Sequence, residues 1–250
     1  MQLAAGSMTD AEWAVRVELA LCYRLVAHYG LTDQIYTHIS ARVPGAPGHF
    51  LLNPLGWRFD EITASSLVKI DLDGRSVEDG SEAVNPAGFT IHSAVMMARD
   101  DVACVLHLHS RAGMAVAALD CGLLPVNQIS MQFHDRLAYH DYEGVSLHLD
   151  ERARLIADLG DKRAMILRNH GLLTAARSVT EAFSRAYYLE TACQVQLDAM
   201  KSGAGLRLPP PEVCEHAARQ YDDFFEKDGP ALEWQANRRL IDKVNPGYAA

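Results

Sequence analysis

Apolar positions recur every three or four residues over several stretches of the chain, which is the period of an amphipathic helix. The first stretch begins at a capping box formed by Thr9 and Glu12 and ends at Gly30. Another begins at Ser178 and ends at Gly203, and Ser110 is expected to cap a third with its side chain. The helix that Ser110 caps is expected at 110–119, further helices are predicted at 85–99 and 150–160, and a proline run precedes two predicted tail helices at 213–225 and 232–244.

Short apolar or alternating runs between these helices predict strands. Runs at 36–42 and 50–52 are joined by a Pro/Gly-rich turn and predict a hairpin, and further strands are expected at 65–72, 103–108, 123–130 and 164–167. Residues 131–142 have no clear period, and two interpretations stay open: a loop lining a site or interface, or a solvated polar loop. Because hairpins are too frequent for an all-parallel sheet, we predict an α/β fold with a mixed sheet between helical layers.

Length and composition set bounds on the class of protein. A chain of 250 residues with 49% hydrophobic and 22% charged residues is typical of one soluble globular domain. We expect that domain to span 9–205. A disordered or artificially added segment is expected at 1–8, and a helical tail at 206–250 that packs on the domain or on a neighbouring subunit.

Charge and cysteine content exclude several classes. The net charge of −9 lacks the positive field that attracts nucleic acid or anionic membranes, so neither partner is expected. The five cysteines are odd in number and contain no Cys-x-x-Cys pair, which argues for a reducing compartment and against a disulfide framework. With no basic-then-apolar leader and no long uncharged apolar run, the predicted location is the cytoplasm.

Three histidines stand where predicted strands end. His107 and His109 alternate with leucines, so their side chains point to the same face of the strand. A second apolar run ends before Asn169, His170 and Gly171, and the glycine is expected to let the chain turn sharply after the histidine. Three imidazoles with a fourth position open form a ligand set for a divalent catalytic metal. A His-x-His pair is also often a hydrogen-bonded pair without metal, so both interpretations stay open here.

Six segments give the chain a resemblance to a known family. They are YTHISAR at 36–42, FLLNPLG at 50–56, EITASSLVK at 61–69, AGFTIHSA at 87–94, HLH at 107–109 and RNHG at 168–171. In this order they resemble the class II aldolase/adducin family over residues 10–205, and the adducin head more than the sugar-phosphate aldolases. The resemblance implies a three-layer α/β/α sandwich with a mixed, largely antiparallel central sheet, and a cyclic homotetramer with sites near subunit interfaces.

The resemblance also implies a cofactor and its ligands. A divalent metal is expected, most often Zn²⁺ with Mn²⁺, Fe²⁺ or Co²⁺ as alternatives, held by His107, His109 and His170. The chain departs from the sugar-phosphate aldolases at Gly88, where those enzymes carry an acid/base carboxylate. Because glycine cannot transfer a proton, another group would have to take that role.

Candidates for the missing acid/base group are His92, His38, Tyr139 and Tyr142. Each of these also has a purely structural interpretation, as a packed or hydrogen-bonded side chain. Candidate substrate-binding residues are Asn53, Gly56, Gly88 and Gln132, although Gln132 also fits a polar loop position. The turns at 55–56 and 86–87 lack the hydroxyls that hold phosphate in the aldolases, which favours a non-phosphorylated substrate.

These features predict a metal-dependent carbon–carbon lyase. It would act by retro-aldol cleavage or decarboxylation on a small hydroxy- or oxo-acid, through a metal-stabilised enolate. The missing base favours decarboxylation, because carbon dioxide leaves by itself. The alternative is a non-catalytic assembly module, similar to the adducin head, with a vestigial or structural metal site; an iron oxygenase is more distant. The absence after Ala250 of the long basic tail found in adducins favours the enzyme.

Overall fold

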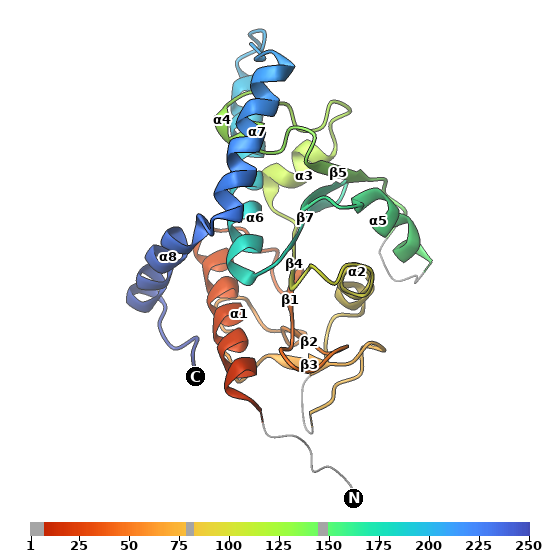
Figure 1. Ribbon diagram of the computed structural model, residues 1–250, viewed down its shortest axis with the longest axis vertical. Coiled ribbons are helices and arrows are strands. Elements are labelled where there is room, and N and C mark those ends of the chain that lie inside the picture. Colours follow the sequence, from red (N-terminus) through yellow and green to blue (C-terminus); the bar gives the residue numbers. More distant parts are fainter. Residues whose placement is uncertain (1–7, 79–82, 145–149) are drawn as a thin grey trace, which may run out of the picture.

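The computed structural model describes residues 8–78, 83–144 and 150–250 (Figure 1). Its strands are β1 (His38–Arg42), β2 (Phe50–Leu52), β3 (Val68–Ile70), β4 (Cys104–Leu108), β5 (Leu137–His140), β6 (Ala164–Leu167) and β7 (Gly171–Ala176). Within the described residues these strands form one sheet in the order β3-β2-β1-β4-β7-β6-β5. Every neighbouring pair is antiparallel except β5 and β6, which run parallel. The predicted mixed, largely antiparallel sheet is confirmed.

Helices cover both faces of this sheet. On one side lie α1 (Asp10–His28), α6 (Val179–Lys201) and α8 (Pro230–Val244), and on the other α2 (Pro86–Ala98) and α5 (Glu151–Leu159) (Figure 1). The shorter α3 (Arg111–Ala117) and α4 (Gln128–Met131) contact α6, and α7 (Pro211–Glu226) contacts α4. The arrangement is the three-layer α/β/α sandwich that the resemblance implies. In the described residues, no helix has the length and hydrophobicity that crossing a bilayer requires.

The central strand β4 lies between two of the three apolar clusters that the described residues form. Cys104, Leu106 and Leu108 pack with α1 in one cluster, whereas Val105 belongs to a second cluster with residues of α2 and α5. Successive strand side chains point to opposite faces, so this division fixes the direction of His107 as well. Burial of each large apolar side chain contributes about 1.5–3 kcal/mol, which makes a shift of register costly. The orientation of the histidine is therefore set by the core.

The strand predicted at 123–130 is wrong. The segment is irregular up to α4, because side chains rather than a neighbouring strand accept its backbone N–H groups. The N–H of Leu123 donates to the hydroxyl of Tyr139 at 3.0 Å, and that of Leu124 donates to Gln196 at 2.6 Å. Asn127 then caps α4 by accepting from the backbone of Ser130 at 2.8 Å.

Two strands escape the sequence patterns. β5 lies inside the segment interpreted as a loop, and pairs in parallel with β6, a segment distant along the chain. β7 directly follows the predicted third histidine, and all six of its residues are buried, so it shows no alternation of polar and apolar positions. Both strands are specified by their partners in the sheet rather than by a local period.

The start of α3 also differs from expectation. Ser110 occupies the N-cap position, but its side chain makes no capping bond. Its hydroxyl donates instead to the carboxylate of Glu190 on α6, at 2.5 Å, and the same carboxylate accepts from the N–H of Gly113 at 2.8 Å. The buried carboxylate of Glu190, which belongs to another helix, thus caps α3. A negatively charged group is favoured at this position because the N-terminus of a helix carries a partial positive charge.

Candidate metal centre

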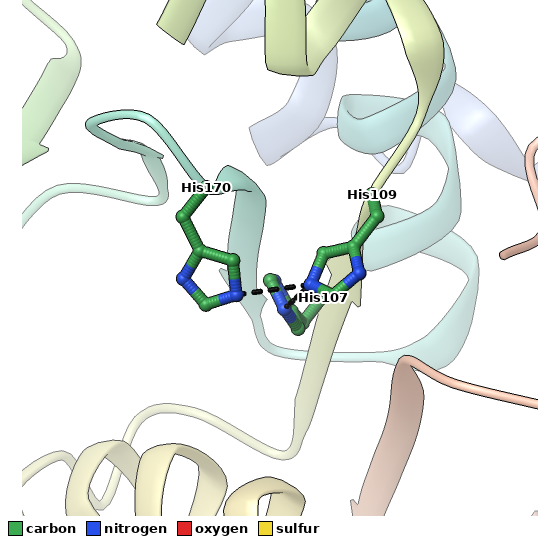
Figure 2. A group of neighbouring side chains, drawn as sticks. All are labelled: His107, His109 and His170. Carbon is green, nitrogen blue, oxygen red and sulfur yellow. Dashed lines mark hydrogen bonds between the residues drawn. The ribbon is translucent and has the colours of Figure 1, made fainter. Parts of the chain in front are cut away.

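The three histidines meet at one end of the central strands. His107 lies in β4, His109 directly follows that strand, and His170 lies in the loop between β6 and β7. Pairing of Leu172 with Leu108 brings this loop back to the end of β4. Figure 2 shows the three rings facing one another. Nε2 of His109 lies 3.0 Å from Nε2 of His107 and 2.9 Å from Nε2 of His170. The predicted convergence is observed.

Asn169, and not Gly171, makes the turn beside His170. Asn169 has a φ of 55°, in the left-handed region that asparagine tolerates, whereas Gly171 lies outside that region. Gly171 is required for space instead. A Cβ there would lie 2.3 Å from the carbonyl oxygen of Leu108 and 3.2 Å from the ring of His109. The sharp turn predicted at Gly171 is therefore wrong, and the residue serves close backbone approach.

Hydrogen bonds fix the tautomers of two of these rings. Nδ1 of His107 lies 2.9 Å from the carbonyl oxygen of Leu172, and Nδ1 of His109 lies 2.8 Å from a carboxylate oxygen of Asp33. A carbonyl and an ionised carboxylate only accept, so both Nδ1 atoms carry the hydrogen. In the neutral rings both Nε2 atoms then present lone pairs, and two acceptors 3.0 Å apart cannot bond to each other. A cation between them, either a metal ion or an added proton, resolves this conflict.

The electrostatics of the buried rings favour a metal ion over protons. Burial, followed by neighbouring histidines, lowers the pKa of His107 well below its ordinary value. Burial and the proximity of His109 and His140 lower the pKa of His170 to about 4. Neutral imidazole is the form that ligates metals. The three candidate ligand atoms lie within 4.8 Å of one another, and a tetrahedral ion with bonds of about 2.0–2.1 Å requires roughly 3.3 Å between ligand atoms, close to the two spacings of 3.0 and 2.9 Å at His109.

Asp33 should contribute to metal affinity without touching the metal. Replacing it with alanine removes the acceptor that holds the tautomer and orientation of His109. We expect the affinity for Zn²⁺ to fall by about 10–100-fold, measured by competition with a chromophoric chelator. Asp198→Ala, at an exposed position of α6, serves as the matched control. Equal affinities for the two variants would contradict the role given to Asp33.

The metal-free protein should lose stability on mild acidification. Folding lowers the pKa of His38, His92, His107 and His170 from about 6.5, mainly through burial. The unfolded chain therefore binds protons that the folded chain does not, so stability is complete above about pH 6.5 and decreases below it. Each ring contributes up to about 1.4 kcal/mol per pH unit. Urea unfolding between about pH 7 and 5 measures this slope, and a flat profile would contradict it.

A second pair of histidines lies next to the triad. His38 on β1 is opposite His107 on β4, and their ring centroids are 5.2 Å apart. Nδ1 of His38 lies 2.8 Å from Nε2 of His92 on α2, and Nδ1 of His92 lies 2.6 Å from the hydroxyl oxygen of Ser40. Gly88 makes room for this arrangement, because a Cβ there would lie 2.5 Å from Cδ2 of His38. Three of the predicted residues, His38, His92 and Gly88, are thus brought to the triad.

Tyr139 is not brought to the triad. Its hydroxyl accepts from the N–H of Leu123, the guanidinium of Arg168 lies 4.3 Å above its ring, and no contact with the triad occurs among the described residues. The choice of Tyr139 as a catalytic group is therefore not supported within this chain. Tyr142, the other tyrosine considered, lies nearer, with its ring 6.2 Å from that of His170.

Two of the other predicted substrate contacts, Asn53 and Gln132, have local hydrogen-bond partners, although Oε1 of Gln132 is buried without one among the described residues. The side-chain oxygen of Asn53 accepts from the hydroxyl of Tyr23 at 2.8 Å, and the amide of Gln132 donates to the carbonyl of Ile129 at 3.0 Å. Gly56 has a φ of 93° and open space where a Cβ would stand. Their roles toward a substrate stay predictions.

Sequence reasoning missed Asp33 and Ser40. Asp33 belongs to the irregular segment between α1 and β1, which carries no motif, so only folding places it beside His109. Ser40 could have been found, because it stands two residues after His38 in a strand and therefore shares its face.

Comparison with known proteins gives the family. Residues 17–197 match the family model described as Class II Aldolase and Adducin N-terminal domain. The chain belongs to the class II aldolase/adducin family. A protein of Caulobacter vibrioides, provisionally named as an aldolase class 2 protein, is 48% identical over 98% of this chain and 95% of its own length. Mouse alpha-adducin is 44% identical over 95% of this chain, which spans only 34% of the adducin.

Solved structures agree with this assignment. An aldolase II superfamily protein from Pseudomonas syringae superimposes with a TM-score of 0.93 at 49% identity, covering 97% of each chain. The L-fuculose 1-phosphate aldolase of Glaciozyma antarctica superimposes with a TM-score of 0.83 at 26% identity, covering 99% of this chain and 97% of the aldolase. The family and fold expected from the sequence motifs are both confirmed.

Proposed function

We propose that this chain is a divalent-metal-dependent carbon–carbon lyase whose metal ligands are His107, His109 and His170. The observation that carries the proposal is the pair of facing acceptor nitrogens on His107 and His109, whose Nδ1 hydrogens are held by other groups. These residues would hold a Zn²⁺ ion, which would supply Lewis-acid chemistry to a bound substrate. Mn²⁺, Fe²⁺ and Co²⁺ are alternatives that also accept imidazole ligands.

The ligand set favours an anionic substrate. Three neutral imidazoles leave the charge of a divalent ion uncompensated, and the carboxylate of Asp33 binds the far side of His109 rather than the centre. The side chain of His109 is 22% exposed, so the centre has access to solvent. A carboxylate next to a carbonyl or hydroxyl group can offer two oxygens to such a centre. A small oxo- or hydroxy-acid is therefore the substrate class that we propose.

The surrounding residues favour decarboxylation over retro-aldol cleavage. Gly88 supplies no carboxylate beside the centre, and burial keeps the pKa of His38 and His92 well below the ordinary value. Such weak bases are poor at removing a hydroxyl proton, which retro-aldol cleavage requires. In decarboxylation the C–C bond breaks with only a site that accepts the electron pair left behind, and the carbon that loses carbon dioxide then takes a proton from solvent, which reaches the partly exposed His109. The resemblance to a fuculose-phosphate aldolase supports carbon–carbon bond cleavage, and leaves the substrate to be identified.

Metal content and a substrate panel together test this proposal. The purified protein is loaded with Zn²⁺, Mn²⁺ or Co²⁺, its metal content is measured by plasma mass spectrometry, and it is then incubated with 2-oxo- and hydroxy-acids. We expect one metal per chain and release of carbon dioxide or an aldehyde, detected by NMR, from a non-phosphorylated acid. Phosphorylated analogues in the same panel test the substrate class. If only the phosphorylated analogues were cleaved, the proposed lyase activity would stand and the proposed non-phosphorylated substrate class would be wrong.

The alternative function is a binding module. It is favoured by the 44% identity to mouse alpha-adducin over 95% of this chain. A metal-free protein that assembles into the expected homotetramer, and shows no turnover after loading, would support this alternative and overturn the lyase. Light scattering of the purified protein gives the assembly state in the same preparation.

A further inference from the structure

Ser40, His92 and His38 form a hydrogen-bonded chain that ends next to the metal centre. The distances are 2.6 Å from Ser40 Oγ to His92 Nδ1 and 2.8 Å from His92 Nε2 to His38 Nδ1. All three side chains are buried, with Ser40 completely inaccessible. The chain therefore exchanges no hydrogen bonds with bulk water at its Ser40 end.

The buried hydroxyl at that end decides the direction of the chain. Among the described residues, His92 is the only side chain or carbonyl within hydrogen-bond distance of Ser40 Oγ. If Nδ1 of His92 carried the hydrogen, the Ser40 O–H would be buried without an acceptor, and leaving a buried donor unpaired is costly. The hydroxyl therefore donates to His92 Nδ1. The Ser40 oxygen then has lone pairs without a donor, which costs less than a buried O–H without an acceptor.

This direction fixes both imidazoles. A neutral His92 that accepts at Nδ1 carries its hydrogen on Nε2, and donates it to Nδ1 of His38. A neutral His38 that accepts at Nδ1 must carry its own hydrogen on Nε2. No hydrogen bond of that Nε2–H is found in the described part of the chain, and Nε2 is not among the buried polar atoms without a partner, so the small exposed part of this 3% exposed side chain includes it. An N–H that no protein group accepts, on a ring whose centroid lies 5.2 Å from that of His107, is a donor that a ligand at the centre can use.

We propose that His38, through Nε2–H, donates a hydrogen bond to an anionic oxygen of the substrate at the metal centre. His92 and Ser40 are positioning residues, because they hold the tautomer and direction of His38 without contacting the substrate. The identity of the ligand as an oxo- or hydroxy-acid rests on the proposed function, whereas the donor state of His38 does not. In this state His38 has no lone pair on Nε2, so it stabilises developing charge and cannot act there as the base considered from the sequence.

Gly88 is part of this arrangement. The ideal Cβ position of residue 88 is 2.5 Å from Cδ2, 2.7 Å from Cγ and 2.9 Å from Nε2 of His38. Any side chain at this position would displace the imidazole from its place beside His107. A carboxylate side chain at residue 88 and the observed position of His38 therefore exclude each other, because the imidazole occupies the space that a larger residue would need.

Neutron diffraction from crystals of the full chain, metal-free and Zn²⁺-loaded, tests the donor state directly. We expect deuterium on Nε2 of both His38 and His92, and the Ser40 hydroxyl directed at His92. Deuterium on Nδ1 of His38 would overturn the inference. In Ser40→Ala the donor to His92 is gone, and we expect deuterium to become distributed over both nitrogens of His38. Retention of a single Nε2 site in this variant would contradict the positioning role of Ser40.

Binding of oxalate to the Zn²⁺-loaded protein tests the acceptor. Oxalate is a planar dianion that resembles an enolate of an oxo-acid, and its affinity is measured by calorimetry. His38→Phe keeps an aromatic ring without the donor, and we expect oxalate to bind about 10–100-fold more weakly with Zn²⁺ affinity unchanged. His38→Gln restores an N–H near Nε2 and should recover part of the loss. Gly88→Ala displaces the His38 ring and should therefore weaken oxalate binding as His38→Phe does.

The outcomes separate this inference from the proposed function. Oxalate binding that depends on His38, without cleavage of any acid in the panel, would leave the inference standing and overturn the lyase. Turnover of an oxo-acid with equal oxalate affinity in the wild type and His38→Phe would overturn the inference and leave the lyase standing.

Discussion

His109→Ala is expected to abolish stoichiometric Zn²⁺ binding while the fold is retained. The side chain belongs to none of the apolar core clusters, so the core is retained without it, and its Nε2 lies within 3.0 Å of both other candidate ligand atoms. Loss of this central donor should reduce affinity by more than the roughly 10–100-fold expected for Asp33→Ala. Any carbon–carbon cleavage by the wild type should be lost in parallel. Metal analysis after equilibrium dialysis measures the bound Zn²⁺, and circular dichroism measures whether the fold is retained.

Zn²⁺ should also affect the thermal unfolding of the wild type and of His109→Ala differently. An ion that binds only the folded state stabilises it by about 2.7 kcal/mol when present at about 100 times its dissociation constant. Zn²⁺ at that level should therefore raise the unfolding temperature of the wild type and leave that of His109→Ala unchanged. His216→Ala, at an exposed position of α7, is the matched control and should respond as the wild type does. One bound Zn²⁺ per chain in His109→Ala would rule out the triad as the metal site.

The parts of the fold that the sequence predicts are those specified by a local period. Capping residues and apolar spacing predict α1 and α6. Both caps are observed, because the side chains of Thr9 and Ser178 accept from the backbone N–H groups three residues further along. The alternation of histidine and leucine in β4 likewise gives the side on which His107 lies. In each case one element carries the whole signal, so no knowledge of its neighbours is needed.

The parts that the sequence does not predict depend on contacts between distant segments. β7 is uniformly buried and carries no alternation, and β5 is specified by pairing with β6. At the site, Asp33 and the Leu172 carbonyl select the tautomers of the ligands, yet neither belongs to a motif. The histidines are visible in the sequence because their side-chain chemistry is distinctive. The groups that orient them are ordinary residues, and only the fold gives them their role.

Gly171→Ala is expected to destabilise the protein and to weaken metal binding together. The added Cβ would lie 2.3 Å from the carbonyl oxygen of Leu108, a backbone atom that cannot rotate away, and 3.2 Å from the ring of His109. Relief of this overlap must move the start of β7 away from the end of β4, which separates His170 from the other two histidines. We expect a loss of about 1–3 kcal/mol or more in the free energy of unfolding, as for other overpacked sites.

Gly205→Ala supplies the control for this substitution. Gly205 also lies outside the left-handed region, and nothing stands within 4 Å of its ideal Cβ position, so the two variants share the same change in backbone entropy and differ in the steric overlap. Gly205→Ala should keep the Zn²⁺ affinity of the wild type and be as stable or up to about 1 kcal/mol more stable, measured by chelator competition and urea unfolding. If Gly171→Ala matched it in both, the close approach of β4 and β7 would not be what holds the histidines together. A loss of stability with unchanged Zn²⁺ affinity would show that the loop carrying His170 adjusts independently of the strand it precedes.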